Sequence, residues 1–314
     1  QKLSFKQHLH EKINKAMKII GTIKRLNTVL PRFSLLTIYK SFVRPHLDYA
    51  DVIYHQPNNQ SICDKIESVQ YNACLAITGA IRGTSRFKLY KELGLESLQD
   101  RRWMRRLCYF YKIFSTRSPS YLFQYLPSST ISPRYPNCFT SIRCRTITFQ
   151  NSFFPYTVNQ WNGLDPEIRN INSYPIFRNT LLKRIKPQDN SIYNIHDPLG
   201  IKLLCRLRFN FSHLREHKFR HNFQDTLNPM CSCSLEPETT THFLLHCQNF
   251  TNLRLTLMSN LNDIDPTISS LDDMNLVNLL LFGEDCFNLN TNKKILEKTI
   301  EFLKNSSRFD ESLF

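Results

Sequence analysis

The stretch that decides the fold of the C-terminal region is CSCSLEPETTTHFLLHC, which runs from Cys231 to Cys247. It places three thiols and one imidazole, at Cys231, Cys233, His242 and Cys247, within seventeen residues. Thiolates and imidazole nitrogens are preferred ligands of Zn²⁺, and four of them fill its tetrahedral shell. A shell closed by four side chains leaves no coordination position for a reaction. The stretch therefore predicts a structural zinc site that folds a short loop.

A competing ligand and an alternative interpretation accompany this prediction. His246 follows His242 by four residues, so both imidazoles would share one face of a helix. The Cys-x-Cys spacing is also less usual in zinc sites than a spacing of two intervening residues. The alternative is therefore a chance cluster of thiols in a cysteine-bearing helical region.

The other cysteines indicate a reducing compartment. Cys63, Cys74 and Cys108 lie in apolar patterns of helical spacing, which is typical of reduced thiols in a core. The N-terminal segment is amphipathic and charged, without the apolar centre of a secretory signal. Apolar runs fall short of the ~18 residues that a transmembrane helix needs. We therefore expect an intracellular protein of the nucleus and cytoplasm that does not contact membranes.

The net charge is +15, and most of it lies in the first part of the chain. Residues 1–128 contain 21 Lys and Arg against 8 Asp and Glu, whereas residues 129–314 contain 20 against 18. A basic region of this kind favours a polyanionic partner, RNA or DNA, bound mostly through its phosphates. The alternative is a solvated basic face that serves only solubility. The 7 glycines form neither a GxGxxG nor a P-loop signature, which argues against a glycine-rich phosphate loop.

Apolar spacing and capping signals predict a mainly α-helical fold in three parts. Residues 1–127 carry at least four helical patterns, with capping boxes at Ser61–Asp64 and Ser97–Asp100. Residues 128–190 form a mixed connector. Residues 191–314 return to helical patterns that surround the cysteine cluster.

Within the connector, alternating residues over 143–149 predict a strand, and a helix is predicted over 174–186. Residues 187–197 read as a linker. Three helices are expected beyond the cysteine cluster, near 251–260, 272–282 and 292–304.

Basic side chains gather at three places where they could contact phosphates. The first is a turn and short helix after residue 80, and the second is the outer face of the next helix, opposite Trp103 and Phe110. The third lies among the histidines after residue 212. Guanidinium groups bind phosphate through paired hydrogen bonds, and neighbouring aromatic rings such as Phe87 can stack on bases. The predicted nucleic-acid contacts are Arg82, Arg86, Lys88, Lys91, Arg101, Arg102, Arg105, Arg106, Arg215 and Lys218.

Three histidines, His213, His217 and His221, recur at steps of four residues. On a helix they would share one stripe. The spacing leaves three interpretations open: a metal site, a basic surface that touches phosphate, or a partly buried structural stripe.

No catalytic centre is predicted. The run Tyr49-Ala50-Asp51-Val52 looks like a polymerase Tyr-Ala-Asp-Asp motif, but Val52 cannot ligate the divalent ions of phosphoryl transfer. The pair Asp272-Asp273 lacks the preceding aromatic residue. Neither a Ser-His-Asp nor a Cys-His constellation shows a defining local signature.

Several segments, in their order along the chain, resemble the region downstream of the palm in reverse transcriptases of non-LTR (LINE-type) retrotransposons, jockey-like elements in particular. The resemblance covers nearly the whole chain, and the order of the segments is more specific than any single motif. The segments are Tyr39–Asp51, Ile66–Gln70, Leu93–Leu98, Asp100–Arg102, Asn151–Pro155 with Trp161 and Asn162, Ser212–Phe219, and His242–Cys247.

The resemblance implies that a palm with catalytic aspartates, and an apurinic-type endonuclease, would lie before Gln1. It implies that residues 1–127 are a thumb-like domain that grips the template–primer duplex. It also implies a zinc-knuckle-like site in the tail, formed by the four Cys and His residues named above. We therefore expect a nucleic-acid-binding remnant of an RNA-directed DNA polymerase, without polymerase activity of its own.

Two other functions remain open from the residues alone. A metal-dependent nuclease could use the histidine segment, and its cleavage would be abolished by His217→Ala. A protein–protein interaction module could instead dock an acidic partner on the basic part of the chain.

Overall fold

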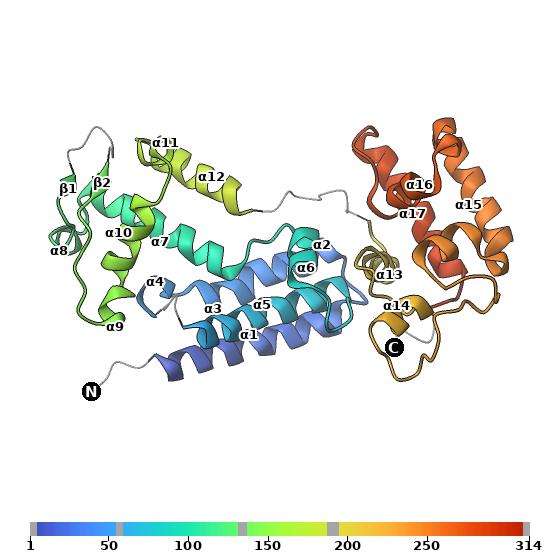
Figure 1. Cartoon of the computed structure of the whole chain (residues 1–314), viewed down its shortest axis with the longest axis horizontal. Helices are drawn as coiled ribbons and strands as arrows, with labels where there is room; N and C mark the ends of the chain where they lie inside the picture. The colour runs from blue at the N-terminus through green and yellow to red at the C-terminus, as the bar shows by residue number, and fades with distance from the viewer. Residues whose placement is uncertain (1–4, 55–58, 131–136, 187–194, 310–314) are drawn as a thin grey trace. The chain divides into compact units, whose positions relative to one another are not determined.

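The structure is a computed structural model that describes residues 5–54, 59–130, 137–186 and 195–309 (Figure 1). It is mainly α-helical, as the sequence predicts. By spatial contact the chain forms two compact units. Unit 1 comprises Gln1–Ile19, Lys40–Tyr71 and Tyr90–Asp189, and unit 2 comprises Ile20–Tyr39, Asn72–Leu89 and Asn190–Phe314.

The chain passes between the units several times, so helices α1, α5 and α6 contribute residues to both. The three-part division at residues 127 and 190 stays a prediction. The shared helices are α1 (Lys6–Leu26), α5 (Gln60–Thr78) and α6 (Arg86–Leu93), and η1 begins with Tyr39 of unit 2.

Unit 1 otherwise contains short helices, one long helix and a two-stranded sheet. The strands are antiparallel and pair Ser129 with Phe139 and Thr130 with Cys138. The elements are η1 (Tyr39–Val43), α3 (Arg44–Asp48), α4 (Asp51–Tyr54), α7 (Leu98–Thr116), α8 (Ser120–Phe123), β1 (Ser129–Thr130), β2 (Cys138–Phe139), α9 (Ile147–Gln150), α10 (Phe153–Asn162), α11 (Pro166–Arg169) and α12 (Tyr174–Ile185).

The core of unit 1 is built on α7, against which α10 and α12 pack. Trp161 on α10 is fully buried, and its ring centroid lies 5.5 Å from those of Phe110 on α7 and Phe177 on α12. Helix α7 buries residues on nearly all of its sides. Arg102 and Arg106 are among these buried residues, so α7 buries charged as well as apolar side chains.

Local signals predict some elements correctly and others wrongly. At α7 the predicted N-cap is confirmed, because Ser97 Oγ accepts from Asp100 N at 3.0 Å. The Asp100 carboxylate accepts from Ser97 Oγ at 2.6 Å, in place of the backbone N–H of a full capping box. At α5 the predicted box is wrong, because Asn59 caps the helix by accepting from Ile62 N. The strand predicted over 143–149 is also wrong. Helix α9 begins there instead, capped by Thr146.

Unit 2 holds the C-terminal helices. The helices predicted near 251–260, 272–282 and 292–304 are confirmed as α15, α16 and α17, and the one predicted over 174–186 as α12 of unit 1. Most of the linker predicted over 187–197 lies outside the described residues. The elements are α2 (Arg32–Ile38), α13 (Pro198–Arg208), α14 (Arg215–Arg220), η2 (His242–His246), η3 (Gln248–Phe250), α15 (Thr251–Ile264), η4 (Pro266–Ser270), α16 (Asp273–Phe282) and α17 (Leu289–Asn305).

The core of unit 2 forms where α17 packs against α13, α15 and α16 (Figure 1). Phe243 in η2 is fully buried in this core. Its ring centroid lies 5.1 Å from that of Phe250, 5.6 Å from Phe302 and 5.5 Å from Phe309. Because Phe243 follows His242 directly, the core fixes the part of the chain that carries two predicted metal ligands.

Among the described helices, none combines the length and the apolar character needed to cross a lipid bilayer.

Candidate functional site

The four predicted metal ligands converge in unit 2. The ligand atoms of Cys231, Cys233, His242 and Cys247 all lie within 4.8 Å of one another. Cys231 Sγ and Cys247 Sγ are 3.6 Å apart, and Cys233 Sγ lies 3.2 Å from His242 Nε2. A tetrahedral Zn²⁺ shell separates two sulfurs by about 3.8 Å and a sulfur and a nitrogen by about 3.6 Å. The group is therefore suited to hold a metal such as zinc.

A tight loop positions the first two ligands. Met230 and Pro237 form an antiparallel bridge, and Cys231 N donates to Glu236 O at 2.9 Å. Ser234 N donates to Cys231 O, and Ser234 has a φ of +62°. This left-handed residue turns the chain so that both thiols point to the same side.

A helical turn of unusual pitch positions the other two ligands. Residues His242–His246 form a π-helical turn, and Cys247 N donates to His242 O at 2.7 Å. This hydrogen bond spans five residues, which matches the spacing between the two ligands. Single π-helical turns are rare and are frequent at functional sites.

The second coordination shell selects His242 over His246. The Nδ1 atom of His242 lies 3.2 Å from Glu236 Oε2, an arrangement that orients a metal-bound imidazole through its other nitrogen. His246 is exposed and points elsewhere, with its Nε2 atom 2.8 Å from Asp273 Oδ2. His246 is thus a neighbour of the cluster and not one of its four ligands.

The thiols differ in how readily they ionise. Hydrogen bonding from the Leu235 backbone, together with the neighbouring ligands, lowers the pKa of Cys233 to about 7. Burial raises the pKa of Cys247 well above its ordinary value. A metal ion must therefore displace the proton of Cys247, so that metal binding and proton release are coupled.

Part of the predicted phosphate-contacting set gathers on a second feature of unit 2. Arg82, Arg86 and Lys88 are exposed on the turn before α6 and on its first residues. Lys88 Nζ donates to Phe209 O at 2.8 Å, and the Phe211 ring lies against Gly83.

This turn lies beside the histidine segment. The Phe211 ring packs against the His221 ring in a tilted arrangement, with centroids 4.0 Å apart. After burial, the positive charge of Lys88 makes a small contribution to the lowered pKa of His217. Two basic segments that are about 130 residues apart in sequence therefore meet in unit 2. We call this feature the basic surface of unit 2; its residues are Arg82, Arg86, Lys88, Arg220 and His221, of which Arg220 is paired with Glu216. Lys91, also predicted, is exposed further along α6.

The prediction that the arginines of α7 form an exposed face is wrong. Arg102 and Arg106 are buried, with 2% and 3% of their surface accessible. Arg101 binds Asp48 and Glu96, each at 2.7 Å, and Arg105 binds Asp51 at 2.9 Å.

The pKa of Arg101 shows how firmly the pairing holds this charge. Burial alone would lower the pKa, but the Asp48 and Glu96 carboxylates raise it above its ordinary value. These arginines stabilise unit 1 internally, because their charges are already balanced and partly removed from water.

The histidine segment is structural at its centre. Helix α14 covers only Arg215–Arg220, so the three imidazoles do not share one helical stripe as predicted. His217 is buried; its Nδ1 atom accepts from Ser212 N, and its Nε2 atom lies 3.4 Å from Thr240 Oγ1. Burial lowers the pKa of His217 to about 4.

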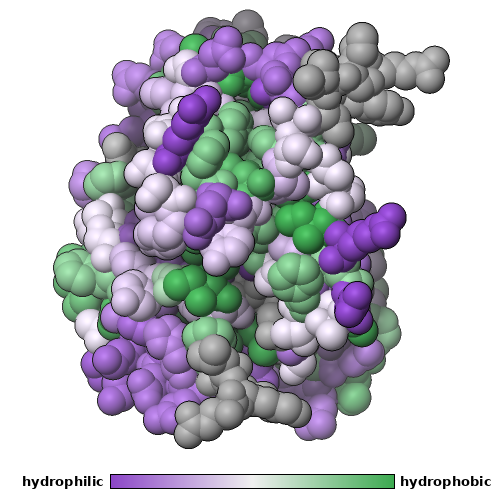
Figure 2. Space-filling model, turned by 90° about the vertical axis from the view of Figure 1, so that its left-hand side faces the viewer, coloured by the Kyte–Doolittle hydropathy of each residue, from purple (hydrophilic) through white to green (hydrophobic). Residues whose placement is uncertain are grey.

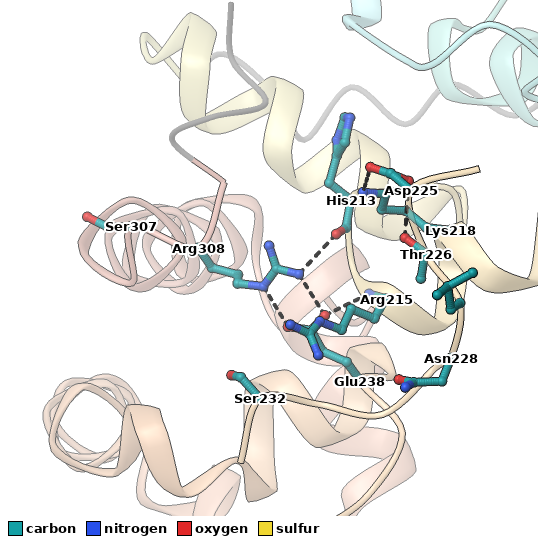
Figure 3. Close-up of a pocket in the computed structure, with 11 residues that line it drawn as sticks. His213, Arg215, Lys218, Asp225, Thr226, Asn228, Ser232, Glu238, Ser307 and Arg308 are labelled. Atoms are coloured by element: carbon teal, nitrogen blue, oxygen red, sulfur yellow. Dashed lines mark hydrogen bonds and ion pairs between the residues drawn. The ribbon is translucent and has the colours of Figure 1, made fainter. Parts of the chain in front are cut away.

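The last two predicted contacts, Arg215 and Lys218, border a cavity of about 750 Å³ in unit 2 (Figure 3). In it Arg308 binds the buried Glu238 carboxylate through two hydrogen bonds, and Lys218 pairs with Asp225. Among the described residues, the Arg215 guanidinium donates to a single acceptor, the backbone carbonyl of Met230. The lining residues are His213, Arg215, Lys218, Asp225, Thr226, Leu227, Asn228, Ser232, Glu238, Ser307 and Arg308.

Comparison of the chain with protein-family models, curated proteins and solved structures gives no match. The interpretation of the site therefore depends on its geometry and on the resemblance noted in the sequence.

Sequence reasoning missed the acidic partners of α7. Asp48, Asp51 and Glu96 neutralise arginines that seemed free. The carboxylate of Asp51, in the Tyr49-Ala50-Asp51 run, was the sequence feature that could have indicated such a partner. Asp51 is only 1% exposed and is bound by Arg105, which explains why a carboxylate stands there without a catalytic partner.

Proposed function

We propose that this protein binds nucleic acid, RNA or DNA, mainly through phosphates and without polymerising it. The basic surface of unit 2 is the contact region, and the Cys231–Cys247 segment forms a structural zinc site that braces the same unit. In this proposal the chain corresponds to the thumb and tail of a non-LTR reverse transcriptase.

One observation carries the proposal. The turn with Arg82 and Arg86 and the segment around His221 approach each other in unit 2, although they are distant in sequence. Exposed guanidinium groups on a rigid support bind phosphates well, because paired hydrogen bonds add to the charge. Phe87 beside them is 75% exposed, which offers a ring to a base or sugar.

The alternative of a histidine-based nuclease has less support. A metal ligand or general base must reach its substrate, but His217 is buried and both of its ring nitrogens face protein atoms. The Cys and His cluster supplies four ligands, so a bound zinc ion would have no open position for a water molecule.

The proposal is tested by fluorescence anisotropy of a labelled RNA–DNA duplex with the purified chain. We expect binding at about 50 mM salt that weakens roughly threefold for each phosphate contact when salt rises to about 200 mM. Absence of binding at low salt would reject the proposal.

A pair of variants separates a defined surface from general positive charge. Arg82→Gln with Arg86→Gln should weaken duplex binding. Lys294→Gln with Lys298→Gln on α17 removes the same charge from another face and should weaken it far less. Equal losses in the two variants would show that net charge alone attracts the duplex.

A further inference from the structure

Unit 1 contains a long segment without acidic residues. Residues 101–164 include nine Lys and Arg and neither Asp nor Glu, and Asp100 and Asp165 bound the segment. The arginines at its beginning are held in the α7 interactions described above. The basic residues after α7 therefore give this part of unit 1 a positive charge that no acidic residue of the same segment can balance.

Three of these later arginines are exposed: Arg117, Arg143 and Arg145. Within the described parts of the chain, none of the three has a carboxylate partner, and the only recorded contact of Arg117 is with the Phe123 ring at 5.7 Å. Arg184 of the same unit, in contrast, pairs with Asp165. These three guanidinium groups are therefore available to an anion.

Three aromatic side chains from the same segment of the chain are unusually exposed to solvent. Tyr121 and Tyr125 are each 64% exposed, and Phe149 is 48% exposed. Rings of this size usually bury most of their surface, so three exposed rings on one part of a unit indicate a contact surface.

Ring contacts connect Tyr125 to aromatic residues of α10 and α7. Tyr125 lies 6.4 Å from Phe154, which lies 5.1 Å from Phe153, which in turn lies 5.6 Å from Tyr109 on α7. Helix α9, with Phe149, contacts α10. Figure 1 shows α8, α9, α10 and the two strands grouped together at this part of unit 1. We name it the aromatic–arginine face; its residues are Arg117, Tyr121, Tyr125, Arg143, Arg145 and Phe149.

A cavity of about 590 Å³ adjoins this face, with Arg117 and Phe123 in its lining. Its wall includes Arg169, which is only 5% exposed. The Arg169 guanidinium donates to Cys138 Sγ and to Asn162 O, and its Nε atom has no partner among the described residues.

The described residues give Arg169 no carboxylate either. A buried guanidinium that is not neutralised makes the cavity beside it positive, because water screens the charge poorly there. The cavity therefore favours an anionic group, and its aromatic lining favours a flat one.

We propose that the aromatic–arginine face binds single-stranded nucleic acid. Bases stack on Tyr121, Tyr125 and Phe149, and phosphates contact the three exposed arginines. Base faces are open in a single strand but are covered by neighbouring pairs in a duplex, so stacking on exposed rings selects the single strand. The adjoining cavity receives one unstacked nucleotide.

The surface chemistry argues against a protein partner. Figure 2 looks onto unit 1 from this side and shows hydrophobic residues interrupted by hydrophilic ones, not a continuous apolar patch. Protein interfaces usually bury an apolar centre within a polar rim. Separate rings between unpaired guanidinium groups suit the alternation of base and phosphate along a strand instead.

This face and the basic surface of unit 2 share no residue, so each proposal can fail without the other. The test uses the full chain and anisotropy with labelled oligouridine RNA and oligothymidine DNA of about 20 nucleotides. A blunt RNA–DNA duplex is measured beside them.

Two variants remove the two kinds of contact. Tyr125→Ala with Phe149→Ala should weaken binding to either single strand roughly fivefold to a hundredfold for each ring lost, and leave duplex binding unchanged. Changing Arg117, Arg143 and Arg145 together to Gln should reduce the slope of log affinity against log salt by about 2 for single strands.

Matched controls are Phe42→Ala, an equally exposed ring elsewhere in unit 1, and Lys15→Gln with Lys18→Gln on α1. Unchanged thermal unfolding verifies that every variant folds. The proposal is overturned if the original chain binds no single strand, if the ring variant binds single strands as the original does, or if single-strand and duplex affinities fall equally. Failure of duplex binding alone would reject the function proposed for unit 2 and leave this face intact.

Discussion

The metal centre gives the sharpest prediction about stability, and it can be tested with two pairs of matched variants. His242→Ala and Cys247→Ser each remove one ligand of the four-membered cluster. His246→Ala and Cys286→Ser change the same residue types at exposed positions that are not in the cluster. All four variants belong to unit 2, so differences between the pairs report on the ligand set.

The magnitude follows from the linkage between binding and folding. A structural zinc ion at about 1,000 times its dissociation constant stabilises the folded state by about 4 kcal/mol. For a domain of about 150–250 residues this corresponds to a shift of about 8–16 °C in Tm. Because the core anchors Phe243 beside the ligands, we expect the helices of unit 2 to remain partly formed without metal.

The assays are metal content per chain by mass spectrometry and Tm with and without a chelator. The original chain and the control variants should hold one zinc ion and lose about 8–16 °C on chelation. The ligand variants should hold none and resemble the chelated original chain. A full zinc ion in His242→Ala, or an unchanged Tm of the original chain after chelation, would refute the reasoning.

Three further predictions concern folding. Burial lowers the pKa of His217 from 6.5 to about 4, so the folded state favours the neutral imidazole. The contribution of His217 to the free energy of unfolding should therefore be complete above pH 6.5, and should fall by up to about 3 kcal/mol between pH 6.5 and 4. Urea titrations of His217→Gln should show a shallower decline, and equal declines would contradict this role. Ser97→Ala should cost about 1 kcal/mol of unfolding free energy by loss of the α7 cap, whereas Ser61→Ala, at a position that does not cap, should change little. A Cβ at Gly200 would overlap a side chain of α17, so Gly200→Ala should lower the free energy of unfolding by about 1–3 kcal/mol. Gly21 on α1 faces open space, so Gly21→Ala should stabilise the protein. A higher Tm for Gly200→Ala than for Gly21→Ala would contradict this packing.

Features encoded over short distances could be predicted from the sequence. The Cys231–Cys247 cluster is such a feature, because its ligands are close in sequence and one loop and one helical turn suffice to bring them together. The Ser97 cap and helices α15 to α17 were also predictable, since caps and apolar spacing act within a few residues.

Features that depend on distant contacts could not be predicted. The arginines of α7 looked like a solvated face, but Asp48 and Asp51, about 50 residues earlier, neutralise two of them. Basic and apolar residues alternate around α7, so its sequence alone does not decide which neighbours cover it. The contact between Gly83 and Phe211 could not be predicted either, because only the fold brings these two residues together.

The central claim is that the basic surface of unit 2 holds phosphates, and its most direct test is the salt dependence of duplex binding. Each phosphate contact contributes about 0.9 to the slope of log affinity against log salt. The variant that carries Arg82→Gln and Arg86→Gln should therefore show a slope about 1.8 smaller in magnitude than the original chain. An identical slope in the two proteins would show that these arginines contact no phosphate, and would contradict the claim.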